Sequence, residues 1–260
     1  MRDLNDILRE VRGRIGAACA RAGRDPAEVE IVAVTKTHGA ETVNEAWDAG
    51  LAIVGENKVQ EAAWKREASV SGPSWHLIGH LQTNKVRVAL ATFDFIHSVD
   101  SLKLIDRIAE VARETGVSPH VLLEVNVSGE KSKTGMPPAE VPGAIARILE
   151  TGSIWLEGLM TMAPFSENPE DARPHFRRLR ELRDEMESRF GIGLPRLSMG
   201  MSGDYEVAVE EGATWIRLGT VLFGERPKLK SVRATGDDTP SAAGGLDSYS
   251  GEGPTFKVLD

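Results

Sequence analysis

Short apolar runs alternate with helical patterns along most of this chain, and this alternation limits the folds that it can adopt. The runs occupy residues 29–34, 51–54, 75–78, 93–97, 120–125, 154–160, 195–198 and 213–218, and a helical pattern follows each of them. Strands that alternate with helices, without Asn-Gly or Asp-Gly hairpin turns between them, indicate a parallel sheet joined by crossovers. Eight such units favour closure into a (β/α)8 barrel of the α/β class, a TIM barrel.

The alternative fold is an open, doubly wound sheet. When such a sheet binds a dinucleotide, a G-x-G-x-x-G turn usually follows its first strand. The first predicted strand is followed here by Thr35-Lys36-Thr37-His38-Gly39, which is not that turn. We therefore expect the barrel.

Two further segments flank the predicted barrel units. Apolar residues recur at helical spacing from Leu4 to about Ala22, which predicts an extra N-terminal helix that ends near Gly23. Residues 230–260 are rich in Gly, Ser, Thr and Asp and have almost no apolar periodicity. We therefore predict a barrel domain over residues 1–229 and a disordered C-terminal tail after it.

Composition excludes several classes of protein. The net charge of -8 and the pI near 5.4 disfavour a nucleic-acid-binding protein, which needs a concentrated basic face. Cys19 is the single cysteine, and the histidines lack metal-ligand spacing, so we expect neither an internal disulfide nor a metal site. No apolar stretch resembles a signal peptide or a membrane span. We therefore expect a cytoplasmic protein with no membrane partner, and a monomer because no exposed apolar stripe is evident.

Lys36 is the first candidate for chemistry. It ends a row with Val32 and Val34, and these three side chains share one face because side chains alternate along a strand. In a barrel this row points inward, and its carboxyl end opens at the mouth where barrel enzymes place their active sites. Partial desolvation there favours the neutral amine, which attacks an aldehyde to form an imine. Lys36 is thus a candidate Schiff-base lysine, and the alternative is a solvated or ion-paired lysine at a strand end.

Two glycine-containing loops follow the predicted seventh and eighth strands. The first begins at Ser198 and runs through residues 199–204, and the second contains Gly219 and Thr220. Loops at these two positions form the usual phosphate pocket of the barrel, because glycines let backbone amides approach an anion. The hydroxyls of Ser198, Ser202 and Thr220 are candidate donors to phosphate oxygens. Taken singly, each loop also fits an ordinary helix N-cap.

Arg217 shares a strand face with Trp215 and stays charged at any working pH. If it points into the barrel, its guanidinium needs a partner. Two partners are open at this stage, a ring nitrogen of a cofactor or an acidic side chain of the barrel.

Together these motifs resemble those of one family. Over roughly residues 4–226 the chain resembles the pyridoxal phosphate homeostasis proteins, which look like the barrel domain of alanine racemase standing alone. The resemblance rests on several motifs in the same order, namely Ala33-Val34-Thr35-Lys36, Gly55-Glu56-Asn57 with Val59-Gln60-Glu61, Trp75-His76 with Gly79, Leu81-Gln82 with Asn84-Lys85, Ser198-Met199-Gly200-Met201-Ser202 with Asp204, and Arg217 with Gly219-Thr220.

The resemblance implies that Lys36 holds pyridoxal 5'-phosphate (PLP) as a Schiff base and that Arg217 faces the pyridine nitrogen. The implied cofactor-binding set is Lys36, Asn57, Ser198, Met199, Ser202, Arg217, Gly219 and Thr220. The implied role is storage, delivery or buffering of PLP, with effects on amino-acid and keto-acid balance. Apo forms of PLP-dependent enzymes are candidate recipients, and no catalytic residue is implied.

Two alternatives stay open. An amino-acid racemase needs a second proton-transfer group on the opposite face of its substrate, and in alanine racemase this group is a tyrosine from a separate β-domain. The candidates in this chain are His80 and Tyr205. The other alternative is a phosphate-binding barrel that holds no PLP, in which Lys36 stays unmodified.

Overall fold

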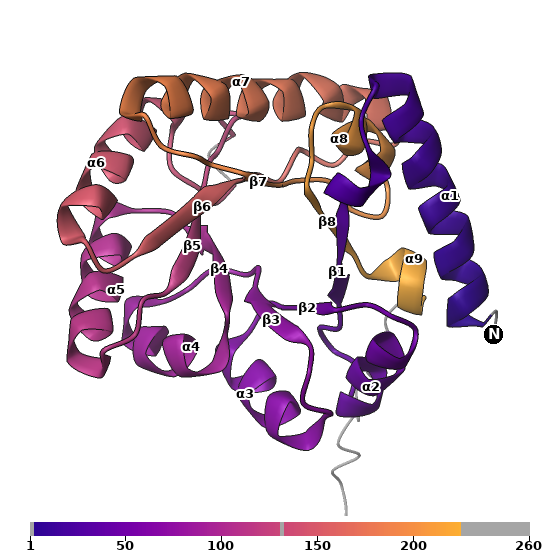
Figure 1. Cartoon of the computed structure of the whole chain (residues 1–260), viewed down its shortest axis with the longest axis horizontal. Helices are drawn as coiled ribbons and strands as arrows, with labels where there is room; N and C mark the ends of the chain where they lie inside the picture. The colour runs from indigo at the N-terminus through magenta and orange to yellow at the C-terminus, as the bar shows by residue number, and fades with distance from the viewer. Residues whose placement is uncertain (1–2, 131–132, 225–260) are drawn as a thin grey trace, which may run out of the picture. The chain divides into compact units, whose positions relative to one another are not determined.

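The computed structural model of the protein describes residues 3–130 and 133–224. Eight parallel strands close into a barrel in chain order, and β8 pairs with β1 (Figure 1). The predicted (β/α)8 barrel is therefore confirmed. The strands are β1 (Glu30–Val34), β2 (Ile53–Glu56), β3 (Ser74–Leu77), β4 (Phe95–Val99), β5 (His120–Glu124), β6 (Trp155–Met160), β7 (Arg196–Ser198) and β8 (Trp215–Leu218).

Helices surround this barrel and connect its successive strands (Figure 1). The α-helices are α1 (Leu4–Ala22), α2 (Ala40–Asp48), α3 (Val59–Ala68), α4 (Val86–Thr92), α5 (Leu102–Thr115), α6 (Val141–Thr151), α7 (Arg173–Phe190), α8 (Tyr205–Glu210) and α9 (Thr220–Phe223). Short 3-10 helices cover Pro26–Glu28, Thr83–Lys85, Pro138–Glu140 and Pro169–Ala172.

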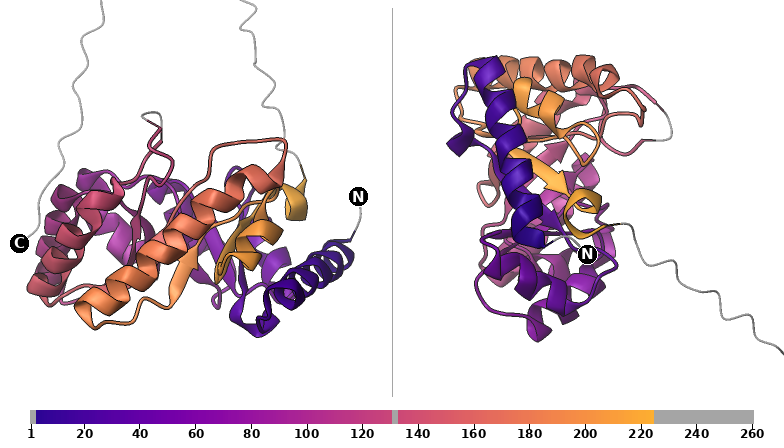
Figure 2. Two further views of the ribbon diagram at one scale, coloured as in Figure 1. Left: turned by 90° about the horizontal axis from the view of Figure 1, so that it is seen from above. Right: turned by 90° about the vertical axis from the view of Figure 1, so that its right-hand side faces the viewer.

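Helix α1 is the predicted extra element that precedes the first strand. It begins at the Asp3 cap, whose side chain accepts a hydrogen bond from the Asn5 amide, and it ends at Gly23, whose φ is +66°. The helix lies alongside α8 and α9 in both views (Figures 1 and 2). Cys19 is fully buried on its inner face and packs in the apolar core.

The strand boundaries differ from the predicted ones by one or two residues, most clearly in β2. The apolar run predicts a strand over residues 51–54, but the strand covers Ile53–Glu56. Leu51 is buried three residues after α2 ends at Asp48, without joining the sheet. The polar Glu56 is in the strand because strand pairing follows the register with β1 and β3, whereas an apolar run reports burial.

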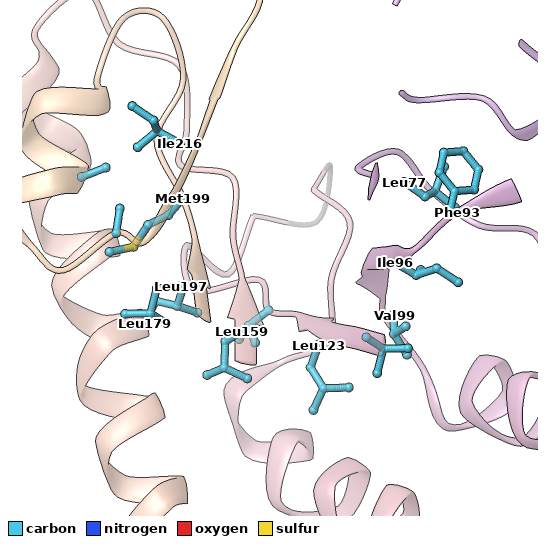
Figure 3. Packing of buried hydrophobic residues seen from close by; sticks show 14 of the residues in the cluster. Leu77, Phe93, Ile96, Val99, Leu123, Leu159, Leu179, Leu197, Met199 and Ile216 are labelled. Carbon is cyan, nitrogen blue, oxygen red and sulfur yellow. The ribbon is translucent and has the colours of Figure 1, made fainter. Parts of the chain in front are cut away.

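The barrel separates two apolar layers. Val32, Val34 and Trp215 pack with other side chains inside the barrel, as the alternation along β1 predicts. The other strand face packs against the helices, and Figure 3 shows part of this outer layer, including Leu197 and Met199 of the β7 segment. The inner row of β1 therefore leads to Lys36 at the carboxyl ends of the strands.

The described residues all belong to one compact unit. None of their helices has the length and apolar character needed to cross a membrane. The predicted disordered tail over residues 230–260 lies outside the described residues, as does the end of the predicted domain over residues 1–229. Both boundaries stay predictions.

Gly158 provides a test of the closed strand pairing. It sits in β6 next to an irregularity in the register with β5, and a Cβ there would lie 1.8 Å from the carbonyl oxygen of Arg196 on β7. We expect Gly158→Ala to lower the free energy of unfolding by about 2–3 kcal/mol or more, since the neighbouring strand must move. Gly13→Ala on the exposed face of α1, where nothing lies within 4 Å, should instead stabilise by about 0.5–1 kcal/mol. Urea unfolding of both variants measures the difference, and equal effects would contradict the packing at β6.

Candidate functional site

A pocket of about 360 Å³ opens at the carboxyl ends of the barrel strands. Its lining comes from loops that are far apart in the sequence, after β1, β2, β6, β7 and β8 among others. Six of the eight predicted cofactor-binding residues line this one pocket, namely Lys36, Asn57, Ser202, Arg217, Gly219 and Thr220. The closure of the barrel brings them together.

The turn after β1 sets the position of Lys36. The next residue, Thr37, has a φ of +69°, which a β-branched residue rarely adopts. Its backbone N–H donates a 2.7 Å hydrogen bond to Oε1 of Glu61, and this bond holds the turn. Lys36 therefore extends from a fixed backbone position at the rim of the pocket, next to Val34.

A buried charged cluster lies behind this turn. The side chain of Lys65 on α3 is fully buried, and its Nζ donates to Oε1 of Glu56 at 2.7 Å and to Oε1 of Glu61 at 2.8 Å. The same Nζ donates to the carbonyl oxygen of Thr35 at 2.8 Å. Thr35 in turn donates its hydroxyl to Oε1 of Glu56 at 2.6 Å. The cluster thus ties α3 to the backbone on both sides of Lys36.

The two carboxylates of this cluster differ in their pKa. Burial raises the pKa of Glu56, and hydrogen bonds from Lys65 and Thr35 only partly oppose it. Burial acts in the same direction on Glu61, but hydrogen bonds from Lys65 and the Thr37 amide outweigh it and lower its pKa. Of the motif at residues 55–61, only Asn57 lines the pocket. The spacing of Glu61 and Lys65, four residues apart on one helix, was the available signal for the cluster.

Asn57 presents an unpaired acceptor at the pocket. Its Oδ1 is buried and accepts no hydrogen bond from the described part of the chain. A Cβ on Gly79 would lie 2.4 Å from the carbonyl oxygen of Asn57, so a glycine is needed for this close approach. Because a buried acceptor without a partner is costly, this oxygen is suited to a donor on a bound group.

Arg217 rises from β8 into the barrel and lines the base of the pocket. Its Nη1 donates to Oγ of Ser198 at 2.7 Å, and its Nη2 donates to the carbonyl oxygen of Thr161 at 2.9 Å. Burial lowers its pKa to about 10, although Glu124 and Asp204 act in the opposite direction. Within residues 3–130 and 133–224 the guanidinium forms no ion pair, so the salt-bridge alternative for Arg217 is not realised there.

Ser198 and Met199 lie outside the pocket lining, unlike the other predicted residues. Ser198 is fully buried below the pocket, where its hydroxyl contacts Arg217 and His97. Met199 points to the outer apolar layer (Figure 3), and its amide donates to the carbonyl oxygen of Trp215. The reason is the alternation of side chains, which sends two consecutive residues to opposite faces of β7.

The loops after β7 and β8 are joined to each other. The Val221 amide donates to Oγ of Ser202 at 3.3 Å, and the Asp204 carboxylate accepts the Met201 amide at 2.6 Å. The amides of Ser202 and Gly203 donate to no acceptor within the described residues. Adjacent amides without an acceptor are candidate donors to an anion.

The charges around the pocket also favour an anion. Lys36, Lys133 and Arg217 line it, and Asp204 is the one acidic side chain among the described lining residues. Burial raises the pKa of Asp204, in spite of its hydrogen bond from the Met201 amide. The pocket therefore has an excess of positive charge.

Two buried histidines occupy the barrel interior beneath Arg217, and the sequence motifs assigned them no such role. Nδ1 of His76 lies 2.9 Å from Nε2 of His97, and Nδ1 of His97 lies 2.9 Å from Oγ of Ser198. Burial lowers the pKa of His76 to about 3 and holds the pKa of His97 well below its usual value, with like-charge effects from neighbouring groups adding to this. Both rings are therefore neutral at physiological pH.

The candidate second proton-transfer residues do not line this pocket. His80 is half-exposed and pairs with Asp100 at 3.0 Å. Tyr205 is buried in the outer layer beneath the guanidinium of Arg14. In the described ranges no cluster of three or more His, Cys, Asp or Glu side chains is arranged to hold a metal ion.

Comparison with known proteins first defines the class. Residues 10–227 match the family model of the alanine racemase N-terminal domain. An alanine racemase structure from Clostridium difficile superposes with a TM-score of 0.70 at 17% identity, covering 87% of this chain and 58% of that one. The likeness to that enzyme shows the fold alone. The class is thus that of the alanine racemase N-terminal domain.

Closer relatives define the family. A pyridoxal phosphate homeostasis protein of Aquifex aeolicus is 46% identical over 220 residues, covering 84% of this chain and 96% of that protein. The Escherichia coli protein of the same name is 38% identical over 241 residues, covering 88% and 100%. PipY of Synechococcus elongatus, solved with PLP bound, has a TM-score of 0.73 at 37% identity, covering 82% and 100%. The chain belongs to the pyridoxal phosphate homeostasis protein family.

The lowered pKa of His76 predicts a particular dependence of stability on pH. The unfolded chain binds a proton on this residue below about pH 6.5, whereas the folded chain does not until about pH 3. Since the unfolded state binds more protons in this window, the free energy of unfolding should fall with decreasing pH, by up to about 1.4 kcal/mol per pH unit from His76.

Urea unfolding between pH 7 and pH 5 measures this slope. We expect His76→Gln to reduce the slope relative to the wild type, because it removes the titrating ring. A slope that is the same in His76→Gln and the wild type would show that His76 protonates normally when folded.

Proposed function

We propose that this chain binds PLP in the pocket at the barrel mouth and holds it as a Schiff base on Lys36. The Lys36 amine adds to the aldehyde carbon and a water molecule leaves, so that a C=N bond replaces the C=O bond. The observation that carries the proposal is that Lys36 and the loops after β7 and β8 line one pocket. A relative solved with PLP bound, at 37% identity, supports it.

The phosphate group is held by Ser202, Gly219 and Thr220. The unpaired amides of Ser202 and Gly203 and the excess of positive charge suit a phosphate dianion. The hydrogen bond between Ser202 and the Val221 amide keeps the two loops in a fixed relation. Of the three hydroxyls that the sequence suggests as phosphate donors, this set keeps those of Ser202 and Thr220 and leaves out that of Ser198.

The ring of the cofactor is held by Asn57 and Arg217. The unpaired Oδ1 of Asn57 is available to a donor, and Arg217 faces the pyridine nitrogen with N–H groups that Ser198 and Thr161 do not use. Ser198, which is buried below the pocket, contributes by holding Arg217. Met199 contributes through the packing of β7 against the outer layer.

The role that fits this site best is storage, delivery or buffering of PLP, without catalytic turnover. Bound PLP supplies an electrophilic imine carbon and a ring that accepts electrons from a carbanion. Arg217, with a pKa of about 10, stays charged at neutral pH and keeps the pyridine nitrogen unprotonated, which weakens this electron sink. We propose that the protein acts as a cytoplasmic monomer and that apo forms of PLP-dependent enzymes are its recipients.

The amino-acid racemase remains the second candidate because the barrel is shared with alanine racemase. That reaction needs an acid-base group within hydrogen-bond reach of the substrate, on the face opposite Lys36. His80 and Tyr205 lie outside the pocket lining, which supports the carrier.

Chemical trapping tests the cofactor and its anchor. After incubation with PLP and reduction with borohydride, we expect mass mapping to find a pyridoxyl group on Lys36, because reduction fixes the C=N bond. Lys58→Ala, which changes an exposed lysine before α3, should keep this adduct, and Lys36→Ala should lose it together with the visible absorbance. If the wild-type protein carries no adduct, the proposal is wrong, and the remaining interpretation is a phosphate-binding barrel that holds no PLP.

An assay of amino-acid racemisation distinguishes a PLP carrier from an amino-acid racemase. We expect purified protein with PLP to interconvert D- and L-amino acids no faster than Lys36→Ala does, as followed by chiral chromatography, because Arg217 weakens the electron sink. Racemisation that is clearly above the Lys36→Ala background would establish the enzyme instead.

A further inference from the structure

A chain of hydrogen bonds runs through the barrel interior from β3 to β8, and we call it the Ser74–Arg217 chain. Oγ of Ser74 lies 3.1 Å from Nε2 of His76, and Nδ1 of His76 lies 2.9 Å from Nε2 of His97. Nδ1 of His97 lies 2.9 Å from Oγ of Ser198, which also accepts from Nη1 of Arg217 at 2.7 Å. Its members come from four strands, β3, β4, β7 and β8.

Arg217 fixes the direction of this chain. A guanidinium has donors and no acceptor, so Oγ of Ser198 must accept from it. The hydroxyl proton of Ser198 then points to Nδ1 of His97, its other hydrogen-bonding neighbour among the described residues. Nδ1 of His97 is therefore an acceptor, and the proton of this ring sits on Nε2.

The assignment of donor and acceptor extends in the same way from His97 to His76. Nε2–H of His97 donates to Nδ1 of His76, which places the proton of His76 on Nε2 and directs it to Ser74. A second proton on either ring would bring two donors face to face. The geometry thus fixes one tautomer for each histidine, and both rings stay neutral.

Packing holds the histidines in this arrangement. The ring of His97 stacks on Trp215 with centroids 4.9 Å apart and an angle of 11° between the planes. His76 meets the edge of the same indole at 4.8 Å and lies 4.7 Å from the ring of Phe95. Because His76, His97 and Trp215 are buried in the barrel and Phe95 is partly buried beside them, a ring flip at either histidine would require the neighbouring rings to move.

We propose that His76, His97 and Ser198 are positioning residues that hold the guanidinium of Arg217 in one plane for the PLP ring, an inference that rests on the proposed function. Ser198 and the carbonyl oxygen of Thr161 engage the two terminal nitrogens of Arg217, and two such bonds fix a planar group. His97 holds the Ser198 hydroxyl in place by accepting its proton. His76 holds the tautomer of His97.

The first test concerns the direction of the chain and needs no cofactor. Long-range 1H–15N spectra of the full chain at neutral pH report which nitrogen of each ring carries the proton, with signals assigned from His76→Gln and His97→Phe. We expect Nε2–H and unprotonated Nδ1 on both His76 and His97. A proton on Nδ1 of either ring would overturn the proposal.

The second test concerns PLP. Ser198→Ala removes the link between Arg217 and His97. The control Ser153→Ala removes another buried serine hydroxyl, which has no hydrogen-bond partner among the described residues and is not a member of the Ser74–Arg217 chain. We expect Ser198→Ala to release PLP about tenfold faster than the wild type, because one hydrogen bond to a charged group is lost, and to lose the single tautomer of His97. Ser153→Ala should keep both properties.

The outcomes separate this inference from the proposed function. If the wild type binds no PLP, the proposed function fails, while the tautomers of His76 and His97 still test the direction of the Ser74–Arg217 chain. If PLP binds and Ser198→Ala releases it at the rate of Ser153→Ala, the positioning role is wrong. If Ser198→Ala folds poorly, His97→Phe is the second variant, because it keeps an aromatic ring against Trp215 and breaks the same link. We expect His97→Phe to release PLP faster than the wild type. An unchanged rate of PLP release would contradict the positioning role.

Discussion

The buried guanidinium of Arg217 is the constraint on which the interior of this barrel depends. A cation that can only donate hydrogen bonds lies on β8 beneath the pocket, and its described partners are neutral oxygens from β7 and the end of β6. Its charge is costly to bury, which appears as a pKa lowered to about 10. Ser198 accepts a hydrogen bond from Arg217, and its own hydroxyl proton then needs an acceptor, which His97 provides. The polar side chains inside the barrel are therefore ordered by the donors of Arg217.

The rim of the pocket depends on a second buried charge. Lys65 pairs with the carboxylates of Glu56 and Glu61 and donates to the carbonyl oxygen of Thr35, and Glu61 holds the strained turn at Thr37. Removal of either partner from such a buried pair leaves an uncompensated charge, which is why the two sides of the cluster are interdependent. The backbone around Lys36 is thereby fixed by α3, an element that follows it by more than twenty residues.

Much of the fold was predictable, because the signals for it are local. The spacing of apolar runs gives eight strands, the helical pattern from Leu4 gives α1, and alternation along β1 places Val34 inside the barrel. The strand ends were less predictable, as β2 shows, because pairing register depends on neighbouring strands and an apolar run such as 51–54 does not report it. Of the candidate site, six residues line one pocket because loops after parallel strands meet at the same mouth, whereas Ser198, the last residue of β7, and Met199 do not line it.

By itself the sequence determined the closed barrel, its family and the loops that meet at its mouth, because periodicity and motif order are properties of the chain alone. Only the tertiary structure decided what surrounds each polar group. It placed Ser198 beneath the pocket with its hydroxyl engaged, turned Met199 to the outer layer, and joined His76 and His97 to Arg217 across strands that lie far apart in the sequence. The physical reason is that the partner of a buried donor or acceptor is set by the closure of the sheet, which no local pattern records.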